Sequence, residues 1–162
     1  MKGDTKETIV YVIIGVLLAW GVNQGLAMAL TTDMPVVAVE SNSMVPVFYK
    51  GDILVLSGGE PGQLKVGDII VYSVAGRDVP VVHRIIKVNP DGSFQTRGDA
   101  NSGQLDFEYY IPQQSVHGKV FLIVPYLGWV KIGMMQFVVP NVAFILIAVI
   151  AIAVIYYGRR LV

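Results

Sequence analysis

The fold class is decided by a run of β-branched residues, Val79–Val88 (VPVVHRIIKV), with turn-forming residues on both sides. Valine and isoleucine favour extended backbone, whereas clusters of Gly, Pro, Asn and Asp end strands. Four further runs have the same character: Val36–Val39, Ile53–Leu56, Ile69–Tyr72 and Val116–Val124. No stretch between Asp33 and Gln114 has a helical period. The sequence therefore predicts a mainly β domain over residues 33–131.

A short internal repeat lies within this region. Residues 50–57 (KGDILVLS) recur as residues 65–73 (KVGDIIVYS), and each copy places a Gly-Asp turn before an apolar strand. Turns of this composition commonly precede strands, because glycine and aspartate suit tight backbone geometry. We interpret the repeat as a means of building the sheet rather than as a chemical motif.

Two uncharged segments, residues 8–32 and 132–158, flank the predicted β domain. A helix needs about 20 apolar residues to cross a hydrocarbon core of about 30 Å. We therefore predict transmembrane helices at residues 9–30 and 137–157. Ala27-Met28-Ala29 also fits a signal-sequence cleavage pattern. The apolar run preceding it is long for a signal core, which favours an uncleaved anchor.

Basic residues near the two ends of the sequence predict its orientation in the bilayer. Lys2 and Lys6 precede the first span, and Arg159 and Arg160 follow the second. Because basic flanks favour the cytoplasmic side, the tails at residues 1–8 and 158–162 are predicted to be cytoplasmic. The region 33–131 would then lie outside the cytoplasm, in an integral cell membrane protein with two spans.

Composition excludes several classes of function. Charged residues make up 15% of the sequence, against roughly 25% in a typical soluble domain, and this low fraction indicates a membrane protein. The 12 basic and 12 acidic residues cancel, which argues against nucleic-acid binding. Absence of cysteine excludes thiol nucleophiles and thiolate zinc sites, and two histidines are too few for a three-histidine zinc site. The sequence predicts no metal and no cofactor.

Ser43 and His83 are the candidates for a nucleophile and its base. Residues 41–46 (SNSMVP) follow the first predicted strand, where an exposed hydroxyl would have rigid support. Taken alone, Ser43 is an ordinary turn residue, and His83 is an ordinary imidazole packed in a sheet. As a pair they are candidates for a catalytic site, because a serine is a weak nucleophile until a base takes its proton. An imidazole suits that task near neutral pH.

The polar loop at residues 97–106 (RGDANSGQLD) contains two more candidates. Asp99 and Asp106 each carry a carboxylate that could orient an imidazole and stabilise it once protonated. The ordinary interpretation of such a loop is a solvated turn. The second histidine of the sequence, His117, looks like a turn or strand-edge residue.

These segments together resemble signal peptidase I, in the form found in archaea and in the eukaryotic endoplasmic reticulum. Residues 41–46 (SNSMVP) and 51–54 (GDIL) look like its nucleophile box, and residues 82–85 (VHRI) look like its second box. Residues 96–101 (TRGDAN) resemble its third box. Residues 118–120 (GKV) and 124–128 (VPYLG) match the closing segment, so the resemblance extends from Val36 to Trp129 in the family's order.

The resemblance implies a signal-peptidase-like catalytic β domain, flanked here by N- and C-terminal transmembrane helices. It implies a membrane-bound serine endopeptidase that removes signal peptides from exported preproteins at the outer membrane face. Ser43 would be the nucleophile and His83 the base. The implied partners are preprotein signal peptides and the lipid bilayer, and the resemblance is compatible with a secretion translocon as a further partner.

The third box departs from the family pattern at two positions. Ala100 stands where the family usually has asparagine. Leu105 stands where its second acidic residue is expected, and Asp106 comes next. With one inserted residue, the resemblance implies that Asp106 orients His83 while Asp99 braces the loop. Strict spacing would instead assign the orienting role to Asp99.

Two other interpretations stay open at this point. A self-cleaving protease of the repressor type would use a lysine base, and Lys87 shares the strand face of His83 by two-residue alternation. Two spans and the lack of a DNA-binding segment count against it. The other is a membrane-anchored β module that binds a partner without catalysis, which leaves the ordered motifs unexplained.

Overall fold

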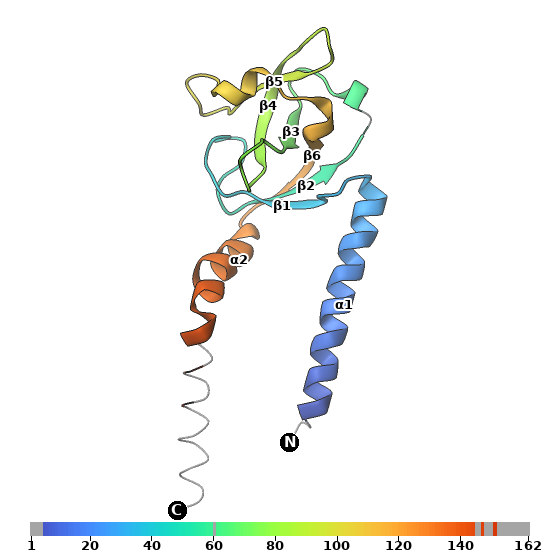
Figure 1. Ribbon diagram of the computed structural model, residues 1–162, viewed down its shortest axis with the longest axis vertical. Helices are drawn as coiled ribbons and strands as arrows, with labels where there is room; N and C mark the ends of the chain where they lie inside the picture. The colour runs from blue at the N-terminus through green and yellow to red at the C-terminus, as the bar shows by residue number, and fades with distance from the viewer. Residues whose placement is uncertain (1–4, 60, 145–146, 148–150, 152–162) are drawn as a thin grey trace, which may run out of the picture.

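The structure is a computed structural model that describes residues 5–59, 61–144, 147 and 151. Its centre is one antiparallel sheet with the strand order β1-β2-β6-β3-β4-β5 (Figure 1). The strands are β1 (Val36–Ala38), β2 (Ile53–Ser57), β3 (Ile69–Tyr72), β4 (Val81–Val88), β5 (Phe94–Arg97) and β6 (Val116–Val124). The mainly β domain predicted from the sequence is confirmed.

The strand β5 is the one that the sequence analysis did not predict. It has only four residues (FQTR), and half of them are strongly polar. Alternating burial identifies it in the structure, because Phe94 and Thr96 are buried while Arg97 is exposed. β5 pairs with β4 at one edge of the sheet, and β1 forms the other edge.

Both faces of the sheet are covered by apolar clusters, because neighbouring residues of a strand point to opposite sides. On β3, Val71 belongs to one cluster, whereas Ile70 and Tyr72 belong to the other. The buried members of the first cluster are Val39, Met44, Phe48, Leu54, Leu56 and Val71. Those of the second are Ile70, Tyr72, Ile85, Phe94 and Ile111. The sheet therefore offers a rigid support on either side.

The internal repeat forms the same turn twice. Gly51 and Gly67 have φ values of 97° and 98°, a region that glycine adopts without steric penalty. Asp52 and Asp68 follow them, and both are buried. Each carboxylate accepts a hydrogen bond from the backbone N–H three residues earlier, at 2.8 Å and 3.1 Å. These contacts fit the structural interpretation of the repeat, since each turn leads into a strand.

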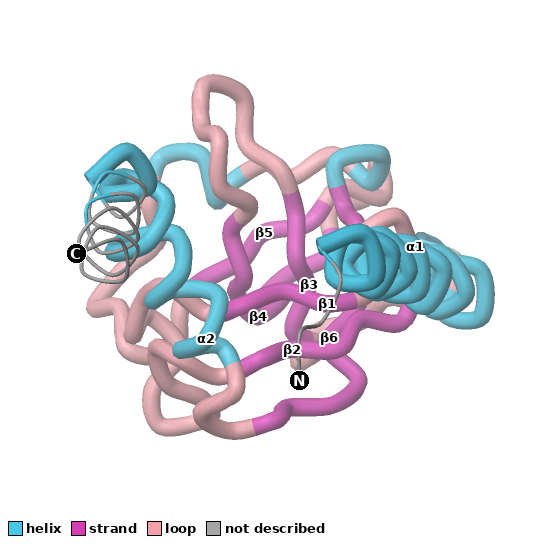
Figure 2. Tube along the Cα trace, turned by 90° about the horizontal axis from the view of Figure 1, so that it is seen from below, coloured by secondary structure: helices cyan, strands magenta, loops and turns pink. Residues whose placement is uncertain are grey.

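The long helix α1 (Thr5–Leu30) precedes the sheet, and its stretch Glu7–Leu30 is long and apolar enough to cross a membrane. After the sheet come α2 (Gly128–Gly133), a π-helical turn (Met134–Val138) and a 3-10 turn (Val139–Asn141). Figure 1 shows α1 and α2 leaving the β domain at the same end, and Figure 2, from below, shows them well apart.

The remaining helices are single 3-10 turns, η1 (Pro61–Gln63), η2 (Asp106–Tyr109) and η3 (Gln113–Ser115). Just over half of the predicted second span, residues 137–157, lies outside the described residues, as does the whole of the predicted tail at 158–162. Residues 1–4 of the other predicted tail also lie outside them.

Candidate active site

Ser43 lies in a loop that is anchored on both sides. The next residue, Met44, is fully buried in the first apolar cluster. The loop is closed by a hydrogen bond from the backbone N–H of Gly51 to the carbonyl of Val39, at 2.9 Å. Because its neighbour is fixed in the core, Ser43 has a defined backbone position although its side chain is only half-buried.

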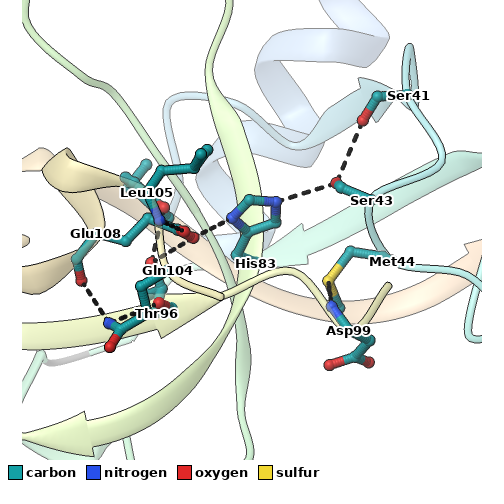
Figure 3. A network of polar contacts seen from close by, with 10 residues as sticks. Ser41, Ser43, Met44, His83, Thr96, Asp99, Gln104, Leu105 and Glu108 are labelled. Carbon is teal, nitrogen blue, oxygen red and sulfur yellow. Dashed lines mark hydrogen bonds and ion pairs between the residues drawn. The ribbon is translucent and has the colours of Figure 1, made fainter. Parts of the chain in front are cut away.

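The Ser43 hydroxyl meets the imidazole of His83. Oγ of Ser43 lies 3.0 Å from Nε2 of His83, which is a buried residue of β4 (Figure 3). The hydroxyl of Ser41 lies 3.3 Å from the same Oγ. The structure thus brings together the two residues that the sequence analysis paired. Hydrogen-bonding distance between a hydroxyl and an imidazole nitrogen is what general-base activation of a nucleophile requires.

The third-box loop packs against this pair. The backbone N–H of Ala100 donates to the carbonyl of Ser43 at 2.8 Å. Gly98 is buried so closely behind the site that an added Cβ would lie 2.7 Å from the Ser43 carbonyl oxygen and 2.8 Å from His83 Nε2. Only glycine fits there without movement of the pair. The sequence analysis treated Gly98 as part of a turn and missed this close approach.

The two predicted aspartates lie elsewhere. Asp99 accepts two hydrogen bonds from Arg84, at 2.9 Å from Nε and 2.6 Å from Nη2, and this pairing raises the pKa of the guanidinium. In Figure 3 its carboxylate is turned away from His83. Asp106 is exposed at the first position of η2. Asp99 therefore fixes the loop to β4. The two ring nitrogens of His83 contact Glu108 and Ser43, so within the part of the chain that the structure describes neither aspartate touches the imidazole.

Glu108 lies beside His83, in the place where the sequence analysis expected the carboxylate of an aspartate. Its Oε1 contacts Nδ1 of His83, and the residue is fully buried near the end of η2. Sequence reasoning missed it because the family pattern pointed to the loop before it. One signal was available: Glu108 is the single charged residue within the aromatic stretch Phe107–Tyr110, where burial of a charge requires a partner.

A cleft of about 810 Å³ opens in front of Ser43 and His83. Three segments supply most of its wall: Val36–Ser41, Val79–His83 and Ala100–Leu105. Met34, shortly after the end of α1, and Lys131 of α2 also line it. The cleft therefore adjoins the two points at which the chain leaves the β domain. Its wall includes β1, an edge strand that pairs only with β2 in the part of the chain that the structure describes.

Lys87 does not share the environment of His83. The register of β4 against β5 shifts between Ile85 and Lys87, and Lys87 is exposed beyond this irregularity. The expectation of a common face is wrong, because a bulge interrupts two-residue alternation. Lys87 is also absent from the cleft wall. The structure gives no support to a Ser-Lys arrangement.

His117 forms a second polar cluster at the start of β6. Its Nδ1 lies 2.9 Å from an Asp33 carboxylate oxygen, and its Nε2 lies 2.7 Å from Oγ of Ser73. Neither Ser73 nor His117 lines the cleft. Within the described part of the chain, no three His, Asp or Glu side chains gather in a way that could hold a metal ion.

A serine hydroxyl paired with an imidazole, in a cleft of a β domain, is the arrangement of a serine hydrolase site. No family model matches the chain. It is similar to proteins named signal peptidase complex catalytic subunit. The SEC11C protein of Rattus norvegicus is 33% identical over 147 residues, covering 85% of this chain and 74% of that protein. The sec11 protein of Dictyostelium discoideum is 33% identical over 153 residues, covering 88% and 82%.

A third relative, the SEC11 protein of Chaetomium globosum, is 36% identical over 118 residues, which cover 67% of this chain and 69% of that protein. The chain belongs to the family of SEC11-type signal peptidase catalytic subunits. The resemblance seen in the ordered sequence motifs is thereby confirmed.

Proposed function

We propose that this protein is a membrane-bound serine endopeptidase that cleaves signal peptides from exported preproteins, with Ser43 as nucleophile and His83 as general base. The observation that carries the proposal is the 3.0 Å contact between Ser43 Oγ and His83 Nε2 in a family of signal peptidase catalytic subunits. The cleft beside this contact gives an extended peptide access to the hydroxyl.

In the proposed reaction, His83 Nε2 takes the Ser43 proton while Oγ attacks the scissile carbonyl carbon. The resulting oxyanion needs hydrogen-bond donors, and the backbone N–H of Ser43 is our candidate for one of them. The protonated imidazole then gives its proton to the leaving amine as the peptide C–N bond breaks. Water, activated by the same imidazole, hydrolyses the acyl-enzyme and restores the Ser43 hydroxyl.

The cleft wall suggests how the substrate lies. An extended peptide gains main-chain hydrogen bonds when it adds to a free strand edge. The strand β1 is such an edge, and its residues line the cleft together with the beginning of β4. A signal peptide bound in this way would present its scissile bond to Ser43, with small side chains in shallow pockets on the cleft floor.

The predicted membrane topology completes the proposal. The helix α1 is apolar enough to span, and Met34 in the cleft wall follows it closely. A bond cut in this cleft would lie near the bilayer surface, where a signal peptide emerges. We propose two spans, at residues 9–30 and 137–157, with cytoplasmic tails and a catalytic domain at 33–131 on the outer face.

Cleavage of a model preprotein in detergent, with mass analysis of the new amino terminus, tests the function. We expect the wild-type protein to cut after a small residue, and Ser43→Ala to leave the preprotein intact. Ser41→Ala should retain much more activity than Ser43→Ala. Equal loss in the two variants would mean that a different hydroxyl attacks, and no cleavage by wild type would contradict the proposal.

A further inference from the structure

We propose that Glu108 is the residue that positions His83 for proton transfer, and that the hydroxyls of Thr96 and Tyr72 fix Glu108 in that role. The inference rests on the proposed function. It replaces Asp106, to which the gapped motif assigned the role, with a residue that no motif identifies.

The sheet places the members of this network side by side. Tyr72, His83 and Thr96 come from the adjacent strands β3, β4 and β5. His83 pairs with Ile70, and Thr96 pairs with Ile85, so their side chains share the face of the second apolar cluster. The turn η2 brings Glu108 onto the same face (Figure 3).

Hydrogen bonds fix both oxygens of the Glu108 carboxylate. Oε1 contacts His83 Nδ1 and accepts from the Thr96 hydroxyl at 3.3 Å. Oε2 accepts from the backbone N–H of Leu105 at 2.7 Å. The Gln104 amide donates to the backbone carbonyls of Thr96 and Glu108, at 3.0 Å and 3.3 Å. The carboxylate is therefore held by β5 and by its own turn at once.

The direction of the hydrogen bonds follows from the available protons. Thr96 has one hydroxyl proton, and it is used toward Glu108. The 2.7 Å contact between Thr96 Oγ1 and Tyr72 Oη must then be donated by the phenol. Burial raises the pKa of Tyr72 far above its ordinary value, and the nearby Glu108 charge raises it further. The phenol therefore stays protonated and serves as a donor throughout the working pH range.

This arrangement determines which nitrogen of His83 acts as the base. A carboxylate at Nδ1 keeps the proton on that nitrogen, which leaves the lone pair of Nε2 directed at Ser43. The same charge stabilises the imidazolium when Nε2 takes the proton from Ser43. Full burial of Glu108 preserves that interaction from solvent screening, whereas the exposed Asp106 has no such advantage.

The variant Glu108→Gln tests the role. His83 Nδ1 and the Leu105 N–H face different oxygens of Glu108, and in an amide one of those two positions is an NH2 donor that cannot accept either bond. We expect kcat for preprotein cleavage to fall by up to about ten-thousand-fold, as for a neutralised triad carboxylate. We also expect the rising limb of the rate-pH profile to move to lower pH, because the imidazolium loses its counter-charge. A purely structural residue would not shift that limb.

Three further variants keep the test decisive. Asp106→Asn changes a carboxylate in the same turn and should leave both rate and profile unchanged. Glu108→Asp retains the charge and should recover part of the activity lost in Glu108→Gln. Should Glu108→Gln fail to fold, Thr96→Val takes its place. It removes one hydroxyl at nearly constant volume and should slow the reaction roughly tenfold, and an unchanged rate would overturn the network.

The labelling rate of Ser43 with a fluorophosphonate probe separates this inference from the proposed function. It reports activation of the hydroxyl without any preprotein. Slow labelling of Glu108→Gln beside normal labelling of Asp106→Asn supports the inference even if no preprotein is cut. Wild-type rates of cleavage and labelling in Glu108→Gln, or loss of both in Asp106→Asn, would overturn it.

Discussion

The described part of the chain contains two clusters in which a serine hydroxyl, an imidazole and a carboxylate are hydrogen-bonded in series. One is formed by Ser43, His83 and Glu108, and the other by Ser73, His117 and Asp33. In both, Nδ1 of the histidine faces the carboxylate and Nε2 faces the serine. The distance to the serine is even shorter in the second cluster, 2.7 Å against 3.0 Å. Connectivity alone therefore does not distinguish them.

Their surroundings differ in burial. The His83 side chain is 5% exposed and Glu108 is 0% exposed, whereas His117 is 18% and Asp33 67% exposed. In water a carboxylate and an imidazole exchange partners freely and interact weakly, and in a buried site they are held in one geometry. The first cluster also borders a cleft whose wall includes the edge strand β1, and the second does not line that cleft. Burial and an adjoining cleft, rather than three residue types, mark the proposed active site.

The largest expected contrast is between the two serines. Ser43→Ala should reduce cleavage by up to about a million-fold, the scale of nucleophile loss in a serine protease. Ser73→Ala should cleave at close to the wild-type rate. A fluorophosphonate probe should label wild type and Ser73→Ala equally, and Ser43→Ala not at all. Labelling that persists in Ser43→Ala and disappears in Ser73→Ala would reverse the assignment of the two clusters.

The two histidines provide the next contrast. We expect His83→Ala and His83→Lys to be nearly inactive, since a lysine opposite the Glu108 carboxylate would be held in its charged form and could not act as a base. Lys87→Ala and His117→Ala should retain most of the activity. Initial rates on one preprotein at constant pH measure all four. Full activity in His83→Ala would eliminate the proposed mechanism.

Gly98 lies only at the first cluster, and its replacement tests how tightly that cluster is held. The Cβ of Gly98→Ala would press on Ser43 and His83 at under 3 Å. A displacement of about 1 Å in reacting groups is enough for a loss on the order of a hundredfold in kcat. Gly62→Ala is the matched control, because nothing lies within 4 Å of its added Cβ. Similar rates in the two variants would show that the third-box loop can shift to accommodate the added methyl group without displacing Ser43 and His83.

The comparison also shows which parts of the protein its sequence predicts. Ser43 and His83 stand out because Ser43 follows a strand with a strong β-branched pattern and His83 lies within one, and strands are positioned by the sheet as a whole. Glu108 could not be predicted, because the path of residues 98–105 between β5 and η2 decides which acidic side chain reaches His83. Lys87 was assigned to the wrong face because a bulge in β4 leaves no trace in the apolar pattern. Local sequence patterns predicted the strands, whereas contacts between distant segments decided which acidic side chain reaches His83.

The smallest effect is expected at Asp33, the carboxylate of the second cluster. Asp33 directly follows Thr32, whose buried hydroxyl donates to the His117 carbonyl at 2.7 Å and accepts from the Met34 N–H at 3.1 Å. The first of these hydrogen bonds fastens the segment that follows α1 to β6, and the second braces the turn at Thr32.

The exposed contact between Asp33 and His117 adds little to them, since surface pairs of this kind contribute about 0–1 kcal/mol. Asp33→Asn should therefore lower Tm in detergent by a few degrees at most and leave cleavage unchanged, whereas Thr32→Val should lower Tm further. A loss of cleavage in Asp33→Asn at an unchanged Tm would give the second cluster a role in catalysis, and the distinction drawn from burial would then fail.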